Sequence, residues 1–235
     1  MKSVWRTDVG RVRSSNQDSL LMLADPYPLY AVADGMGGHL GGDIASAMAI
    51  NGLKDSLQGI APSQEQIMRC FSDISRNIYR CQIQDKGLTG MGTTLTMLWE
   101  DDREIFLGHV GDSRAYLLRA GELRQLSLDH SLVTELLRTG AIDASAAESY
   151  PYRNVITRAV GAEEEIVCDT AVIDKLPGDR FLLCSDGLSE YVKFKALAAL
   201  LGQEGMEHIA DTLLATALNL GGRDNVTFII MEVEA

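Results

Sequence analysis

Five aspartates in this sequence stand where an apolar run meets a turn that contains glycine or asparagine. They are Asp18, Asp34, Asp112, Asp186 and Asp224. Loops at strand ends often carry chemistry on a rigid scaffold, although turns also use aspartate for plain hydrogen bonding. If these carboxylates converge, each pair about 5 Å apart repels by about 3 kcal/mol at an effective dielectric of roughly 20. We therefore expect such a cluster to form only around cations.

Oxygen ligands without a cysteine or histidine pair favour hard ions, so Mg²⁺ or Mn²⁺ is expected. Gly35 follows Asp34 directly and, having no side chain, lets its own carbonyl approach an ion. Two ions about 3.5 to 4 Å apart can activate a shared water and clamp the oxygens of a phosphoryl centre. Arg13 lies near Asp18 in the sequence and offers a guanidinium fork that suits a phosphate. These residues indicate phosphoryl hydrolysis without a protein nucleophile.

The segments that must position these residues are mostly short apolar or alternating runs, which are typical of strands. The runs cover residues 3–8, 20–23, 29–34, 93–100, 104–110, 114–118, 123–126, 166–172, 180–185 and 226–233. Asp101-Asp102 and Ala120-Gly121 lie between neighbouring runs at hairpin spacing. This spacing predicts an antiparallel meander in the middle of the chain and argues against a parallel, doubly wound sheet.

Helical periodicity is clearest after Pro62, where Ser63 and Gln66 form a capping-box pattern and the helix ends near Gly87. Further helices are expected over residues 43–57, 193–201 and 207–218, with a short one over 131–140. Two helical pairs among about ten strands indicate an α+β fold in which the helices pack on sheet faces.

The chain has 235 residues and a formal net charge of −12, which argues against nucleic-acid binding through clustered Lys and Arg. Its longest apolar run, 196–201, is too short to span a bilayer. The first residues lack the apolar stretch of a secretory signal. We expect one domain over residues 1–235, in a cytoplasmic protein without membrane contact, with a monomer as the default state.

Seven short motifs occur in one order along almost the whole chain. They cover residues 13–18, 32–39, 90–94, 109–114, 157–161, 184–188 and 222–227. Among them are Arg13-Ser-Ser-Asn-Gln-Asp18, Asp34-Gly-Met-Gly-Gly-His39 and Gly222-Arg-Asp-Asn-Val-Thr227. In these motifs the chain resembles the metal-dependent serine/threonine protein phosphatases of type 2C, the PPM family, and especially its compact bacterial members.

The resemblance implies a four-layer α-β-β-α sandwich of two antiparallel sheets flanked by helical pairs, with two Mn²⁺ or Mg²⁺ ions at one end. It implies that Asp34 bridges the two ions and that the Gly35 carbonyl binds the second. It also implies that Asp186 and Asp224 complete the ligand set of the first ion. By the same resemblance, Asp34, Asp186 and Asp224 would also be catalytic residues.

Three further roles follow from the same resemblance. Asp18 is expected to be an outer ligand near the second ion, and Asp112 would share a third, weaker site with Asp186. Arg13 is expected to bind the substrate phosphate.

The chain departs from some relatives in having Met36, not histidine, directly after the Asp-Gly pair. The acid that protonates the leaving group can then be His39 or a water bound to metal, and the sequence does not choose between them.

The implied activity is hydrolysis of phosphoserine and phosphothreonine in proteins by a metal-bridging hydroxide, opposing a cognate kinase in signalling. One alternative is a non-catalytic regulator that binds metal or a phosphoprotein on the same fold. Another is a two-metal phosphoesterase that acts on nucleotides or nucleic acid. Residues 129–154 occupy the place of the family's flap, with a loop expected over 143–152 that selects substrates or simply covers the sheet end.

Overall fold

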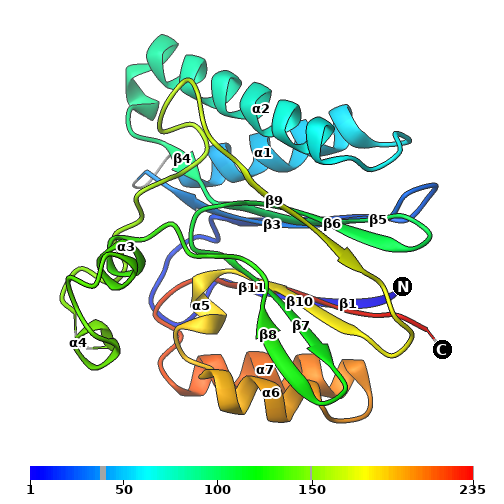
Figure 1. Ribbon diagram of the computed structural model, residues 1–235. Coiled ribbons are helices and arrows are strands. Elements are labelled where there is room, and N and C mark those ends of the chain that lie inside the picture. The colour runs from blue at the N-terminus through cyan, green and yellow to red at the C-terminus, as the bar shows by residue number, and fades with distance from the viewer. Residues whose placement is uncertain (38–40, 149, 235) are drawn as a thin grey trace.

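Among the residues that the structure describes, the strands form two antiparallel sheets that face each other (Figure 1). The structure is a computed structural model that describes residues 1–37, 41–148 and 150–234. The strand order of the first sheet is β1 (Lys2–Asp8), β11 (Val226–Glu232), β10 (Arg180–Cys184), β7 (Arg114–Arg119) and β8 (Glu122–Gln125). The order of the second is β2 (Asp18–Leu23), β3 (Leu29–Met36), β5 (Leu95–Glu100), β6 (Glu104–Val110) and β9 (Asp169–Asp174), with β4 (Gly92–Thr93) paired to β3.

Helices cover the outer faces of both sheets (Figure 1). The second sheet is covered by α1 (Gly42–Leu57) and α2 (Gln64–Gln84), and the first sheet by α6 (Phe194–Leu201) and α7 (Met206–Asn219). The remaining helices are short: η2 (Lys86–Leu88), α3 (Leu132–Arg138), α4 (Ala144–Glu148) and α5 (Asp186–Ser189). The predicted four-layer α-β-β-α sandwich is confirmed.

Apolar side chains fill all three spaces between the four layers. Strand β11 shows how, because alternate residues of a strand point to opposite faces. Phe228 and Ile230 pack toward α6 and α7, while Ile229 and Met231 pack between the sheets. In the helical layer on the second sheet, Ser63 caps α2 by accepting a hydrogen bond from the Gln66 backbone N–H at 3.2 Å, as its sequence pattern predicted.

The predicted meander is wrong in one respect. The hairpins β5–β6 and β7–β8 are both antiparallel, but β6 belongs to the second sheet and β7 to the first. The chain crosses between the sheets at Gly111, which has φ +112°, a conformation that side-chain-bearing residues rarely adopt. Hairpin spacing predicts which neighbours pair, but it does not show that two hairpins belong to different sheets.

Two element boundaries also differ from the prediction. Strand β9 begins at Asp169, which pairs with His109 near the end of β6, so residues 166–168 lie outside the ladder. Helix α4 lies within the predicted loop over 143–152. The Asp143 side chain starts it by accepting a hydrogen bond from the Ala146 N–H at 2.8 Å, and the alanine-rich sequence favours a helix.

The helices α3, α4 and α5 lie toward the end of the sandwich that is opposite the two chain termini (Figure 1). Asp18 and Asp34 lie in the strands β2 and β3, whereas Asp112, Asp186 and Asp224 lie in the segments that adjoin β6, β10 and β11. Of the described helices, none is long and apolar enough to cross a membrane.

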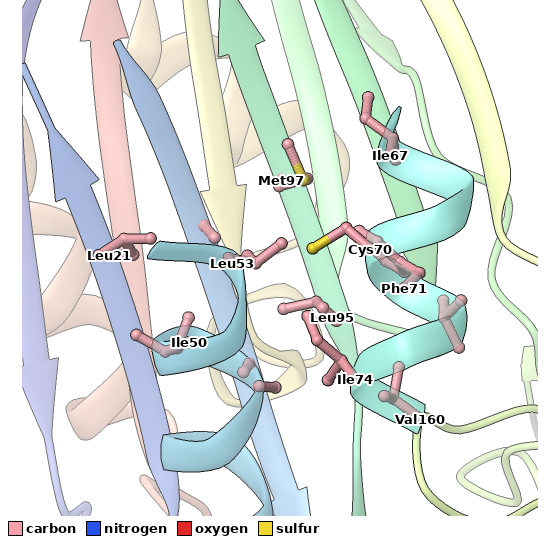
Figure 2. Close-up of a cluster of buried hydrophobic side chains, with 14 of the residues drawn as sticks. Leu21, Ile50, Leu53, Ile67, Cys70, Phe71, Ile74, Leu95, Met97 and Val160 are labelled. Carbon is pink, nitrogen blue, oxygen red and sulfur yellow. The ribbon is translucent and has the colours of Figure 1, made fainter. Parts of the chain in front are cut away.

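Shortening a side chain in the packed layer between α2 and the second sheet should destabilise the fold. Figure 2 shows Phe71 of α2 beside Leu95 and Met97 of β5, and Phe71 is completely buried. Phe71→Ala should lower the free energy of unfolding by about 3–5 kcal/mol in urea denaturation, because it leaves a cavity. The control Met68→Ala changes a side chain of the same helix that is 47% exposed, and its effect should stay within about 0.5 kcal/mol. Equal losses in the two variants would contradict the assigned packing.

Candidate active site

Asp18 and Asp34 are brought together by strand pairing. Asp18 opens β2 and lies directly opposite Asp34 of β3 in the antiparallel register. Directly opposed residues hold their side chains on one face, about 4.5–5.5 Å apart at Cβ. Ser185, just before α5, donates from Oγ to Asp18 Oδ2 at 2.9 Å, so the first sheet holds this carboxylate against the second.

The other aspartates come from turns at the same end of the two sheets. Asp112 lies in the turn between β6 and β7, Asp186 is the first residue of α5 after β10, and Asp224 precedes β11. Together with Asp34 they line one cavity of about 560 Å³. The structure therefore brings these four predicted residues into a single site. Asp18 is not among the described residues that line this cavity.

The carboxylates of this cavity are hard to ionise together. Burial, and after it the neighbouring carboxylates, raise the pKa of Asp34 and of Asp186 well above the ordinary value of 3.8. Burial raises the pKa of Asp18 to about 6. Burial and the charge of Asp129 raise the pKa of Asp112 to about 6. Each shift shows that ionised carboxylates at this site lack sufficient compensating charge.

The donor set fits hard cations. Two buried carboxylate oxygens, Oδ1 of Asp18 and Oδ1 of Asp186, have no hydrogen-bond partner among the described residues. All the candidate donors are oxygens, which suits Mg²⁺ or Mn²⁺. No three His, Cys, Asp or Glu side chains within residues 1–37, 41–148 and 150–234 already form a metal-binding group. Ions here would need carbonyl and water oxygens in addition to the carboxylates.

Backbone crowding keeps Gly35 free of a side chain. A Cβ at Gly35 would lie 1.9 Å from the Gly42 carbonyl oxygen and 2.7 Å from the Gln17 carbonyl oxygen. Gly35 also lines the cavity. The expected backbone ligand is therefore placed at the site, and any larger residue would displace the surrounding loops.

Arg13 lies beside the acidic residues, as expected for a phosphate ligand. It lines the same cavity, and its Nη2 donates to Asp224 Oδ2 at 2.7 Å. The hydrogen bond to Asp224 raises the pKa of Arg13, so the guanidinium is always charged. Half of the Arg13 side chain is exposed, which leaves donors available to a ligand.

Several hydroxyl and amide side chains that hold the site were missed by sequence reasoning. Thr94 Oγ1 accepts from the Asp34 N–H at 2.9 Å and lies 2.7 Å from Ser113 Oγ, which ties β3 to the turn of Asp112. Asn225 is buried and holds the loop that carries Arg13, because its Nδ2 donates to the Val9 and Ser15 carbonyls at 2.9 Å. The available signal was their position, since each of the three side chains stands within the quoted motifs.

Two further predictions concern His39 and the segment 129–154. His39 lies outside the described residues. From the segment 129–154, Asn154 lines the cavity, as does Ile156 just beyond it. Ile156 forms an isolated bridge with Ser131, which fixes both ends of this segment at the mouth of the site.

A comparison with known families matches residues 10–219 to the protein phosphatase 2C family. The chain belongs to the protein phosphatase 2C family. The serine/threonine phosphatase Stp of Listeria monocytogenes serotype 4b is 37% identical over 241 residues, which covers 99% of this chain and 96% of that protein. The expectations of family and of phosphatase class are confirmed.

Solved structures agree with this assignment to protein phosphatase 2C. The serine/threonine phosphatase Stp1 from Staphylococcus aureus is 32% identical, with a TM-score of 0.94, and the match covers 100% of this chain and 95% of that one. The catalytic domain of the phosphatase PstP, solved in complex with two manganese ions, is 34% identical with a TM-score of 0.89, covering 100% of this chain and 98% of that one.

The raised pKa values predict how stability depends on pH when no ion is bound. Between the unfolded pKa near 3.8 and the folded pKa of about 6, Asp18 and Asp112 hold protons only in the folded state. With chelator present, the free energy of unfolding should therefore fall by about 1–3 kcal/mol per group as the pH rises from about 4 to about 7. Urea denaturation at a series of pH values measures this slope.

Asp18→Asn provides the control for the pH prediction. The amide cannot ionise, so the variant should show a shallower slope and higher stability near neutral pH in chelator. A slope identical to that of the unsubstituted protein would contradict the burial of an ionisable Asp18.

Proposed function

We propose that this chain hydrolyses phosphoserine and phosphothreonine in proteins, using two divalent ions at the cavity lined by Asp34, Asp186 and Asp224. The observation that carries the proposal is the convergence of buried carboxylates and a charged Arg13 on one cavity. A non-catalytic regulator that only binds a phosphoprotein would gain nothing from such a concentration of repelling charge. The substrate class follows the names of the relatives, and we extend it to this chain.

Each acidic residue has a proposed role at the ion site. Asp34 would contact both ions, with the Gly35 carbonyl on one of them and Asp186 and Asp224 on the other. When bound, such ions supply Lewis acidity that activates water and offsets the charge of the phosphate. Asp18 would act at the rim of the set, where its unpartnered Oδ1 is available. Asp112 and Asp186 would form the third, weaker site.

Arg13 would orient the phosphate. A guanidinium can donate two parallel hydrogen bonds to phosphate oxygens, which fixes the phosphorus relative to the carboxylates. Its ion pair with Asp224 holds the guanidinium at the cavity before substrate arrives. The hydrogen bonds of Asn225 to the loop 9–17 limit the positions that Arg13 can take.

The proton for the leaving serine or threonine oxygen would come from His39 or from water. Both remain open in the proposal because His39 lies outside the described residues. We further propose that residues 1–235 act as one catalytic domain, as a cytoplasmic monomer in signalling that opposes a protein kinase, without binding membranes or nucleic acid.

Loss of one ion ligand should abolish most of the activity without unfolding the chain. Asp186→Asn keeps the side-chain shape but removes a charge that the ions require, and kcat on a small aryl phosphate with Mn²⁺ should fall by about 100-fold or more. Calorimetric titration with Mn²⁺ should show weaker binding. Added chelator should abolish the activity of the unsubstituted protein.

The matched control for this prediction is Asp73→Asn on α2, where an exposed carboxylate pairs with Arg76 across a helical turn. It should retain full turnover and full Mn²⁺ binding. Near-normal activity of Asp186→Asn, or activity that survives chelation, would refute the proposed centre.

Replacing Arg13 should weaken phosphate recognition. Arg13→Ala removes charge-assisted hydrogen bonds to the phosphate and should lower kcat/KM by about 10- to 100-fold, with a weaker inhibition by inorganic phosphate. Arg13→Lys keeps the charge but loses the planar fork, so its kcat/KM should lie between that of Arg13→Ala and that of the unsubstituted protein. Arg69→Ala, which removes an exposed arginine of α2, is the control. Unaltered inhibition by phosphate in Arg13→Ala would exclude the assigned role.

A further inference from the structure

A second cavity adjoins the catalytic one, and we name it the flap groove. Its volume is about 970 Å³, and Asp112, Asn154 and Asp186 line both cavities. Residues of α3 and α4 line one part of the groove, and residues of α5 and of the start of α6 line another. Figure 1 shows α3 and α4 standing away from the sheets at this end. When the phosphorylated side chain of a substrate protein enters the catalytic cavity, the substrate residues next to it are therefore within reach of the groove.

One ion pair fixes part of the groove lining and neutralises Asp129. Arg114 Nε donates to both carboxylate oxygens of Asp129, at 3.0 and 2.9 Å, and its Nη2 donates to Oδ2 at 2.6 Å. Gln125 Nε2 adds a hydrogen bond of 2.8 Å to Asp129 Oδ1. Because the charge of Asp129 is compensated within the lining, the charge offered to a ligand comes from other residues.

Lys193 and Lys195 supply that charge. Both line the groove and both are exposed. Neither lysine takes part in an ion pair of the described residues. Glu190, Asp112 and Asp186 contribute opposing carboxylates to the lining, the last two on the side shared with the catalytic cavity, and Arg153 contributes a further cation. On a chain with a net charge of −12, these two lysines place positive charge locally at the edge of the groove.

Phe194, which stands between the two lysines in the sequence, gives the groove an apolar surface. The ring of Phe194 packs against Tyr116, with ring centroids 6.3 Å apart, yet 49% of Phe194 is exposed. Leu137 of α3 also lines the groove and is 39% exposed. The groove thus offers an apolar contact on a rigid support, with cations beside it.

We propose that the flap groove docks the residues next to the phosphorylated serine or threonine, preferring an apolar side chain near Phe194 and acidic side chains near Lys193 and Lys195. The proposal rests on the phosphatase function proposed above. Two observations select this occupant: the groove shares lining residues with the catalytic cavity, and its two exposed lysines, which form no ion pair among the described residues, complement a segment rich in Asp or Glu. Lys193, Phe194 and Lys195 are then specificity-determining residues.

Two phosphothreonine peptides of equal length test the charge preference. One has glutamates and the other has lysines on both sides of the phosphothreonine, and each keeps a leucine. For every protein, kcat/KM on each peptide is divided by kcat/KM on a small aryl phosphate, which is too short to reach the groove. The unsubstituted protein should favour the acidic peptide by about fivefold, since two exposed ion pairs are worth little each. Roughly 1 M salt should remove most of this preference.

Charge reversal should remove the preference or invert it. The variant is Lys193→Glu with Lys195→Glu, and the matched control is Lys54→Glu with Lys86→Glu, which changes the net charge equally at exposed lysines outside the groove lining. The control should keep the preference for the acidic peptide. Phe194→Ala should reduce kcat/KM for the leucine-containing peptides relative to peptides with serine in its place. Melting temperatures check that each variant is folded.

Three outcomes would overturn the docking proposal. They are equal use of both peptides by the unsubstituted protein, an equal loss of preference in the two charge-reversal variants, and a dimer that the groove variant dissociates while peptide preference is unchanged. Absence of turnover on the aryl phosphate itself would instead refute the phosphatase function, so the two failures are distinguishable.

Discussion

The burial of several carboxylates in one site, with their mutual repulsion added to it, is the constraint on which this structure depends. Asp18, Asp34, Asp112 and Asp186 all have raised pKa values, mainly because burial removes water from their charged forms. Folding therefore has to hold together groups that would separate in water, and the free energy for this comes from apolar packing elsewhere. Cations bound at this site would relieve the repulsion and stabilise the folded state.

The two-sheet architecture meets this constraint by dividing the site between its halves. The second sheet contributes Asp18 and Asp34 from paired strands, and the first contributes Asp186 and Asp224 from the turns beside β10 and β11. The hydrogen bond from Ser185 to Asp18 links the halves directly. The site is complete only when the sheets are packed face to face, so the apolar layer between them supports catalysis as well as stability.

Much of the fold and the site was predictable from local sequence. Continuous apolar runs marked the central strands because these are buried on both faces, as in β11, and alternating runs marked edge strands such as β8, which have one more exposed face. The acidic residues were recognisable because each stands beside a turn residue. Two of the three failures share a cause. The division of β6 and β7 between sheets and the start of β9 depend on partners distant in the chain, and the short helix α4 depends on a single capping side chain.

The sequence by itself determined the chemistry available to this protein: hard oxygen donors, a nearby guanidinium, and alternating segments long enough to form sheets. Tertiary structure decided which of these groups meet. Burial in the folded protein raised the pKa of four of the site aspartates. Hydrogen bonds of Thr94, Ser113 and Asn225 fix the segments that carry the site residues. Packing also brought α3, α5 and α6 together around the flap groove. Residue type and spacing are local properties of a chain, whereas proximity, burial and electrostatic coupling exist only after segments far apart in sequence have packed together.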